Sequence, residues 1–225
     1  MTATSDAGPV TIAERVGRLQ EGMARQMPAE ALEVFGAEQD RLDTLGVPEG
    51  VTTVGFEVPD ASLLDVHGAQ TTLRTAVGSA PAVIVLYRGA WCPYCNLTLR
   101  VYQEDLVPAL AERGVGLIAI SPQKPDGSLS VQEKNELTFT VLSDPGNQIA
   151  SALGVLTAPT DEAQAIQRSL GIDLHESNAD GTAAVPMPTV VLVDSNAVIR
   201  WIDVHPNYTT RTEVGNILAA IDAPA

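Results

Sequence analysis

The sequence predicts an α/β domain with a mixed central sheet flanked by helices, preceded by an N-terminal helical hairpin. Between residues 82 and 154, apolar runs of strand length alternate with helical segments. This spacing produces parallel strands joined by helical crossovers. Two further apolar runs, at 189–193 and 197–202, flank a short polar turn as in an antiparallel hairpin. Before residue 49, apolar residues recur at helical spacing instead.

The N-terminal segment contains two predicted helices. The first carries its apolar residues at helical spacing, at Ile12, Val16, Leu19 and Met23. The second follows Pro28 and runs until Gly46 and Pro48 stop it. We expect residues 1–49 to form an extension and residues 50–225 to form the main domain.

The main domain begins with short apolar pieces broken by Pro and Gly, which predict irregular structure and a small hairpin over 50–73. The regular elements then follow in order. We predict strands at 82–87, 115–120 and 139–142, and helices at 93–113, near 130–135 and up to Gly154. Pro108 is expected to kink the first of these helices.

A helical piece at 161–170 and a polar loop at 176–181 interrupt the α/β pattern and indicate an insertion. The predicted hairpin of 189–202 follows, and a closing helix is expected over 210–221.

Composition narrows the classes of function. The chain has 225 residues, 45% of them hydrophobic, which is enough for one sizeable core. A net charge of −15 argues against nucleic acid and anionic membranes as partners. The first ten residues lack the basic start and apolar core of a secretory signal, and no apolar run reaches the length of a membrane span. We therefore expect a cytoplasmic protein.

The only two cysteines, Cys92 and Cys95, directly follow a predicted strand and begin a helix. Free backbone N–H groups and the helix dipole favour an anion at this place, so we expect the thiol of Cys92 to become a thiolate near neutral pH. Pro93 suits the first helical position, and the spacing turns both sulfurs to one face. The pair is therefore expected to cycle between dithiol and disulfide.

Two other interpretations of the cysteines remain open: half of a zinc site, or two thiols without a special role. Zinc needs about four ligands. The sequence has no second cysteine pair, and its three histidines are scattered, so no metal site is expected. The position at a strand-to-helix junction favours redox chemistry, and this chemistry requires no bound cofactor.

Residues around the cysteines are candidates for binding substrate. Arg88 ends the strand and is positioned to stabilise a thiolate or hold a polar substrate, unless it is simply a solvated surface arginine. Trp91 is either part of an apolar rim for a docking substrate or a core residue. Met187 and Pro188 immediately precede an apolar strand whose start could lie beside the thiols.

The order of these elements resembles the thioredoxin fold. In that fold, a cis proline at the position of Pro188 faces the disulfide. More closely, the stretch 83–96, followed by 116–121 and by Leu142-Ser143-Asp144-Pro145, resembles the peroxiredoxin-like branch of the alkyl hydroperoxide reductase and thiol-specific antioxidant family. The resemblance covers roughly Gly55 to the C-terminus. It implies that Cys92 is the attacking thiol and Cys95 the resolving thiol.

One motif of that family is missing. Typical peroxiredoxins have a Pro-x-x-x-Thr/Ser-x-x-Cys motif, but Val85 and Gly89 occupy its first two positions when Cys92 is taken as its cysteine. Counting from Cys95 instead places Arg88 and Cys92 there. Neither choice restores the motif.

The prediction for function is a thiol-dependent antioxidant oxidoreductase. It would reduce hydroperoxides through the Cys92/Cys95 pair and be recharged by a thioredoxin-like electron donor. The alternatives are a protein disulfide reductase without real peroxidase activity, and a non-catalytic redox-sensing scaffold whose helical hairpin recruits a partner. A homodimer is compatible with all three.

Overall fold

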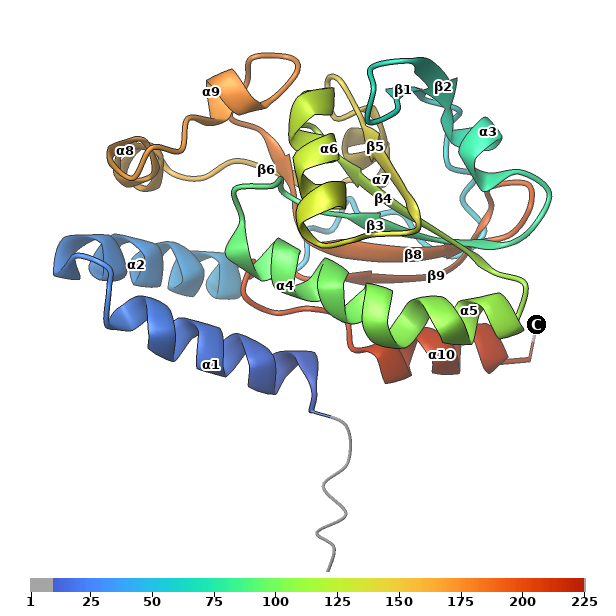
Figure 1. Ribbon diagram of the computed structural model, residues 1–225, viewed down its shortest axis with the longest axis horizontal. Coiled ribbons are helices and arrows are strands. Elements are labelled where there is room, and N and C mark those ends of the chain that lie inside the picture. Colours follow the sequence, from blue (N-terminus) through green and yellow to red (C-terminus); the bar gives the residue numbers. More distant parts are fainter. Residues whose placement is uncertain (1–9, 225) are drawn as a thin grey trace, which may run out of the picture.

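A seven-stranded mixed sheet forms the centre of the computed structural model, which describes residues 10–224 (Figure 1). The strand order is β2-β1-β5-β4-β3-β8-β9. The central β3, β4 and β5 are parallel, whereas β8, β9 and the β1–β2 hairpin add antiparallel neighbours. The bounds are β1 Ser62–Leu64, β2 Gln70–Thr72, β3 Ala82–Leu86, β4 Gly116–Ser121, β5 Thr140–Ser143, β8 Thr189–Val193 and β9 Ile199–Val204. A separate two-stranded sheet pairs β6 (Leu156–Thr157) with β7 (Val185–Pro186).

Strand β3 divides the core into two clusters, because successive side chains of a strand point to opposite faces. Val83 and Val85 pack into one cluster, and Ala82, Ile84 and Leu86 into the other. All five are buried, which explains why this strand is apolar throughout instead of alternating with polar residues.

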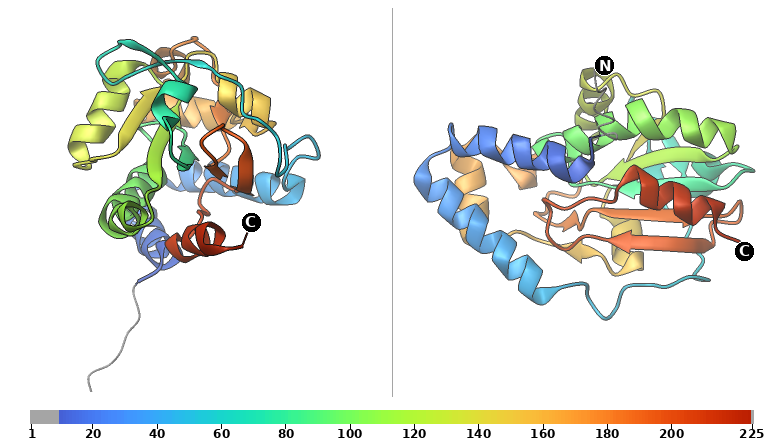
Figure 2. Two further views of the ribbon diagram at one scale, coloured as in Figure 1. Left: turned by 90° about the vertical axis from the view of Figure 1, so that its right-hand side faces the viewer. Right: turned by 90° about the horizontal axis from the view of Figure 1, so that it is seen from below.

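Helices cover both faces of the sheet. The cluster around Val83 includes side chains of α1, α4, α5, α6 and α10, and Figure 2 shows α1, α4, α5 and α10 on one side. The other cluster includes side chains of α3 and α7. The bounds of these helices are α1 Ile12–Ala24, α3 Leu73–Val77, α4 Pro93–Val101, α5 Val107–Glu112, α6 Pro125–Lys134, α7 Gln148–Leu153 and α10 Val214–Asp222. This architecture confirms the predicted mixed α/β fold.

The predicted helical hairpin is present as α1 and α2 (Ala29–Leu45). Thr11 and Glu14 form a capping box at the start of α1. The carboxylate of Glu213 accepts hydrogen bonds from the N–H groups of Ile12 and Ala13, at 2.9 Å each, and so ties α1 to the beginning of α10. The division at residue 49 stays a prediction. Buried residues of the hairpin share a core cluster with the sheet.

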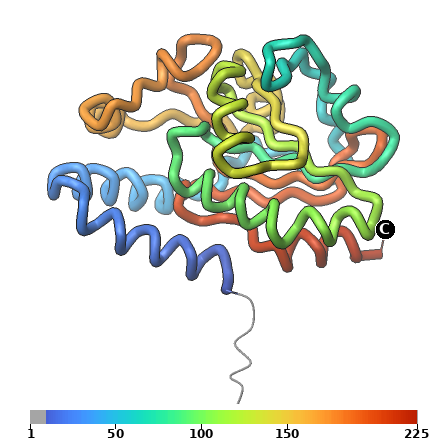
Figure 3. Tube along the Cα trace, in the orientation of Figure 1, coloured from blue at the N-terminus to red at the C-terminus, as the bar shows by residue number. Residues whose placement is uncertain are grey.

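The long helix after the cysteines differs from its prediction. Figure 3 shows α4 and α5 following one continuous path. They are joined by a π-helical turn, Tyr102–Leu106, in which the N–H of Val107 bonds to the carbonyl of Tyr102. Proline lacks an N–H and its ring clashes with the carbonyl four residues earlier, and the widened turn just before Pro108 accommodates it.

Two helical segments extend beyond the sheet, α8 (Asp161–Ser169) and the short α9 (Leu174–Ser177). They lie in the predicted insertion, and α8 packs against α2. Within residues 10–224, none of the helices combines the length and apolar character needed to cross a bilayer.

Candidate active site

Both cysteines lie where the sequence predicts, at the N-terminus of α4 directly after β3. Cys92 is the N-cap residue and Pro93 the first helical residue. Both side chains are free thiols, 1% and 2% exposed respectively. The site is therefore a buried dithiol.

The loop between β3 and α4 is held by Gln123, which follows β4. The Gln123 Oε1 atom accepts a hydrogen bond from the N–H of Ala90 at 2.6 Å, and its Nε2 atom donates to the hydroxyl of Tyr87 at 3.3 Å. Gly89 has a φ of +146°, and a Cβ there would lie 2.5 Å from the indole nitrogen of Trp91. A glycine is thus required both by backbone conformation and by space.

Arg211 is the functional residue that the sequence analysis missed. Its Nη2 atom lies 3.4 Å from the Sγ of Cys95 and 3.9 Å from the Sγ of Cys92. Its Nη1 atom donates to the carbonyl oxygens of Tyr208 and Thr210. One guanidinium therefore lies within 4 Å of both sulfurs. The polar composition of residues 205–212 is the signal that could have drawn attention to this loop.

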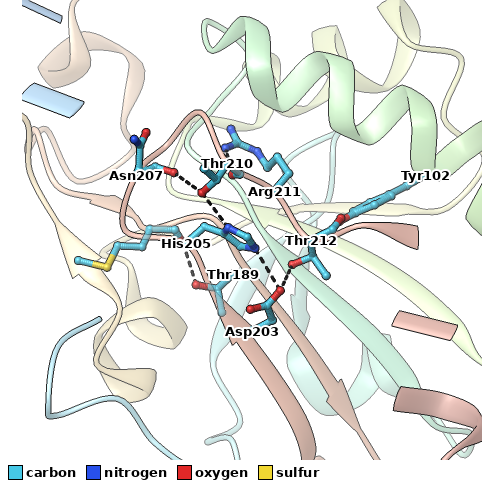
Figure 4. Close-up of polar contacts among 9 residues, drawn as sticks. Tyr102, Thr189, Asp203, His205, Asn207, Thr210, Arg211 and Thr212 are labelled. Atoms are coloured by element: carbon cyan, nitrogen blue, oxygen red, sulfur yellow. Dashed lines mark hydrogen bonds and ion pairs between the residues drawn. The ribbon is translucent and has the colours of Figure 1, made fainter. Parts of the chain in front are cut away.

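A polar network holds the loop that carries this arginine (Figure 4). His205 contacts the hydroxyl of Thr210 through Nδ1, at 2.8 Å, and the carboxylate of Asp203 through Nε2, at 3.1 Å. The same carboxylate accepts a hydrogen bond from the Thr212 hydroxyl at 2.9 Å. The buried Tyr102 hydroxyl donates to the Thr212 carbonyl at 2.7 Å. These bonds explain why α10 begins at Val214 and not at the expected Thr210.

The contacts around the thiols favour a thiolate on Cys95 over one on Cys92. Burial alone would raise the pKa of Cys95, but the thiol of Cys92, the guanidinium of Arg211 and the backbone N–H of Arg88 lower it to about 5. Burial, together with the neighbouring Cys95, raises the pKa of Cys92 well above its ordinary value. The sequence analysis expected the thiolate on Cys92, whereas the directions of these two pKa shifts favour Cys95. As the N-cap residue, Cys92 forms no side-chain hydrogen bond to the helix start, whereas three donors converge on Cys95.

Arg88 acts on Cys95 through its backbone, whereas the sequence analysis considered only its side chain. Its side chain is 5% exposed, so it is not a solvated surface arginine. The guanidinium carbon lies 4.2 Å from the ring centroid of Tyr208 and 4.9 Å from that of Trp91. Its backbone N–H faces the sulfur of Cys95.

The predicted cis bond before Pro188 is absent. No peptide bond within residues 10–224 is cis. A trans peptide bond is the more stable form. With it, the backbone groups of Met187 and Pro188 make hydrogen bonds to neighbouring segments. The N–H of Met187 donates to the carbonyl of Val155 at 2.8 Å, and the carbonyl of Pro188 accepts from the N–H of His205 at 2.9 Å.

Pro188 nevertheless lies close to the thiols. It lines a small cavity of about 10 Å³ together with Cys95, Thr189 and Arg211. Met187 is buried in the second core cluster, on the other side of the sheet from the cysteines. The structure therefore brings Arg88, Trp91 and Pro188 to the dithiol. Met187 packs in the second core cluster and lines a small cavity of about 10 Å³ together with Arg88, Pro188 and Tyr208.

A much larger cavity, of about 520 Å³, opens beside Cys92. Trp91 and Tyr94 border it next to the thiol, and residues of α1, α2 and the α8 segment complete its wall. Across residues 10–224, no group of three or more His, Cys, Asp and Glu side chains is arranged to hold a metal ion.

Comparison with known proteins identifies a family for this chain. The family model of the AhpC/TSA family matches residues 54–202. The chain is 29% identical over 108 residues to the thiol-disulfide oxidoreductase ResA of Bacillus thuringiensis. This alignment covers 48% of this chain and 61% of the relative. It is 33% identical over 103 residues to a putative peroxiredoxin, bcp, of Haemophilus influenzae, covering 46% and 65%. The chain thus spans about three fifths of the length of these relatives.

Solved peroxiredoxin structures share the fold. Reduced Prx3 from Vibrio vulnificus, solved with hydrogen peroxide, superimposes with a TM-score of 0.62 at 17% identity, over 76% of this chain and all of the other. A peroxiredoxin-like protein from Aquifex aeolicus gives a TM-score of 0.59 at 15% identity, over 78% and 88%. At these identities the likeness demonstrates a common fold, and it confirms the thioredoxin-like architecture. Because the family model covers more than half of the sequence, this chain belongs to the AhpC/TSA family.

Proposed function

We propose that the protein is a thiol-dependent antioxidant oxidoreductase that reduces hydroperoxides by cycling Cys92 and Cys95 between dithiol and disulfide. One observation carries the proposal: the guanidinium of Arg211 lies within 4 Å of both sulfurs of a buried dithiol. A thiolate is the reactive form of cysteine, and a buried thiolate forms only where such partners offset the loss of solvation.

In this proposal Cys95 takes the attacking role, because the guanidinium of Arg211 lies closer to its sulfur than to that of Cys92. Its thiolate attacks the terminal oxygen of the hydroperoxide, so that an S–O bond forms and the O–O bond breaks. The thiol of Cys92 then supplies the proton that the leaving alkoxide needs. Cys92, now a thiolate, attacks the sulfenic acid on Cys95, so that the S–S bond forms, the S–O bond breaks and hydroxide leaves. The hydroxide takes a proton from solvent to become water, and a disulfide within one chain remains. This order reverses the roles that the family resemblance implied.

If Cys95 is the attacking cysteine, Cys92 takes the place of the hydroxyl that the family motif lacks in this chain. With Cys95 as the attacking cysteine, Cys92 occupies the position three residues earlier where typical peroxiredoxins have a hydroxyl. From this position the thiol of Cys92 lowers the pKa of Cys95, as a neighbouring hydroxyl donor would. A thioredoxin-like dithiol donor would complete the cycle by exchange with the disulfide. The cycle needs no metal or cofactor.

A second candidate is a protein disulfide reductase. It is favoured by the similarity to ResA and by Val85 and Gly89 at the motif positions counted from Cys92. A non-catalytic redox scaffold is disfavoured, because it would not require a guanidinium directed at both sulfurs.

Two assays on the reduced protein separate these functions. Stopped-flow oxidation by hydrogen peroxide, followed through the change in tryptophan fluorescence, is expected to be fast and to saturate at one disulfide per chain. Insulin disulfide reduction is expected to be slow in comparison. The reverse order of activities would establish the reductase, and the absence of both would leave the scaffold.

The cellular setting is part of the proposal. We propose a cytoplasmic location, where reducing conditions keep the dithiol available between turnovers. We also propose a homodimer without disulfide links, to be tested by sedimentation of the reduced and oxidised protein.

A further inference from the structure

His205 joins three segments around the arginine loop, residues 205–212, which carries Arg211 (Figure 4). Its backbone N–H donates to the carbonyl of Pro188, directly before β8, at 2.9 Å. Its ring contacts the hydroxyl of Thr210 through Nδ1, at 2.8 Å, and the carboxylate of Asp203 on β9 through Nε2, at 3.1 Å. Both ring nitrogens are engaged, and this fixes the orientation of the imidazole.

Asp203 and His205 together hold both sequence neighbours of Arg211. Thr210, the residue before it, is held by the imidazole. Thr212, the residue after it, is buried and donates its hydroxyl to the Asp203 carboxylate at 2.9 Å. The hydrogen bonds from His205 and Thr212 lower the pKa of Asp203 against the effect of burial, so the carboxylate stays charged and accepts both bonds. The backbone on either side of Arg211 is thus fixed by one carboxylate and one imidazole.

The place of the Arg211 guanidinium depends on this loop. Its Nη1 atom donates to the carbonyl oxygens of Tyr208 and Thr210, which belong to the loop itself. Of the ion pairs formed within residues 10–224, none involves Arg211. An arginine side chain has many rotamers when nothing restrains it. The conformation of the loop therefore decides where this charge lies.

The dithiol is close enough to respond to a shift of the loop. His205, Arg211 and Cys95 line one cavity of about 10 Å³, the space of about one water molecule. A displaced guanidinium would let water in between itself and the sulfur, and both the longer distance and the higher dielectric constant weaken their attraction. Against burial, the Cys92 thiol and Arg211 lower the pKa of Cys95. Loss of the position of Arg211 should therefore raise that pKa.

We propose that Asp203 and His205 are positioning residues for the dithiol: they hold the arginine loop so that the guanidinium of Arg211 stays against both sulfurs. Their effect on Cys95 passes through Arg211. The inference rests on the proposed function, in which Cys95 is the reactive sulfur, and it adds two residues that control this reactivity from outside the dithiol.

The test compares variants by the pH dependence of iodoacetamide labelling at Cys95. His205→Phe keeps a ring and removes both ring contacts. Thr212→Val keeps the shape of the side chain and removes the bond to Asp203, whereas Thr212→Ser keeps the hydroxyl. His175→Phe is the matched control, because His175 lies on α9 and its Nδ1 also contacts a loop oxygen, a backbone carbonyl at 2.8 Å. Urea unfolding of each variant gives its stability.

We expect His205→Phe to raise the midpoint of the labelling profile by about one pH unit, since doubling the distance between two charges halves their Coulomb energy. Thr212→Val should shift the midpoint in the same direction, and it tests the other end of the loop should His205→Phe not fold. Thr212→Ser and His175→Phe should keep the wild-type midpoint.

A double substitution shows whether the effect passes through the guanidinium. In the Arg211→Met background, His205→Phe should cause no further shift, because the charge that it displaces is already gone. A direct effect of the imidazole on Cys95 would persist in that background.

Three results would overturn the inference. The first is a wild-type midpoint in both His205→Phe and Thr212→Val, which together with a lower free energy of unfolding would leave the pair a purely structural role. The second is a shift by His205→Phe that is as large in the Arg211→Met background as in the wild type. The third is an equal shift in His175→Phe. The labelling uses no peroxide, so a wild type that reduces no hydroperoxide would refute the proposed function and leave the positioning role standing.

Discussion

Replacing Arg211 by methionine should move the titration of the dithiol toward that of a free thiol. The guanidinium lies 3.4 Å from the Sγ of Cys95 and 3.9 Å from that of Cys92. Two unit charges about 4 Å apart interact by about 4 kcal/mol at an effective dielectric constant of about 20. Since about 1.4 kcal/mol corresponds to a tenfold change in acid dissociation, the loss is about a thousandfold. Methionine keeps most of the volume of the side chain, so the effect reports mainly the lost charge.

The consequence for reactivity can be worked from the pKa of Cys95, which is about 5. Losing this interaction raises the pKa of Cys95 toward the ordinary range of a thiol, so the thiolate fraction at pH 7 falls. Alkylation of Cys95 should therefore slow about tenfold at pH 7 and recover above pH 8. In the wild type the rate should stay constant down to about pH 6 and decline as Cys95 takes up its proton near pH 5.

The assay is iodoacetamide labelling against pH, with the modified cysteine identified by mass spectrometry. Arg211→Lys keeps the charge and should lie between the wild type and the methionine variant. Arg18→Met removes an exposed arginine from α1 and should leave the profile unchanged. A midpoint that stays near pH 5 in Arg211→Met would refute the reasoning, and so would preferential labelling of Cys92 in the wild type.

Three further predictions concern the disulfide and the supports of the site. Cys92→Ser should trap a dimedone-reactive sulfenic acid on Cys95, whereas the oxidised wild type should contain a disulfide within one chain; obligatory disulfide-linked dimers on a non-reducing gel would contradict this. Tyr102→Phe removes a buried hydrogen bond and should lower the free energy of unfolding in urea by about 1 kcal/mol; an unchanged midpoint would show that this bond contributes no stability. Glu213→Ala frees the first two amides of α1 and should cost about 1 kcal/mol. Hydrogen exchange in α1 should then accelerate while exchange in β3 does not. Equal protection of α1 in the wild type and in Glu213→Ala would show that Glu213 does not stabilise α1.

The elements near the cysteines were predictable because their signals are local. The apolar run at 82–86 and the Pro93 helix start each depend on residues within a few positions. The π-helical turn before Pro108 was not predicted. The sequence shows only that Pro108 disturbs the helix, whereas packing decides where a wider turn forms. The cis bond expected at Pro188 came from the family resemblance alone. The hydrogen bonds around that residue are satisfied by a trans bond.

By itself, the sequence determined the fold class, the helical hairpin and the placement of two thiols at a helix start, because hydrophobic period, proline and glycine act over short distances. Only the tertiary structure brings a cation to the two thiols. Arg211 lies 116 positions after Cys95, and it reaches the sulfur because the network around Asp203 folds its loop back onto α4. Tertiary structure also joins the hairpin and the α8 segment into one cavity beside Cys92. Charge stabilisation and cavity shape depend on distances in space, and those are set by packing between elements far apart in the chain.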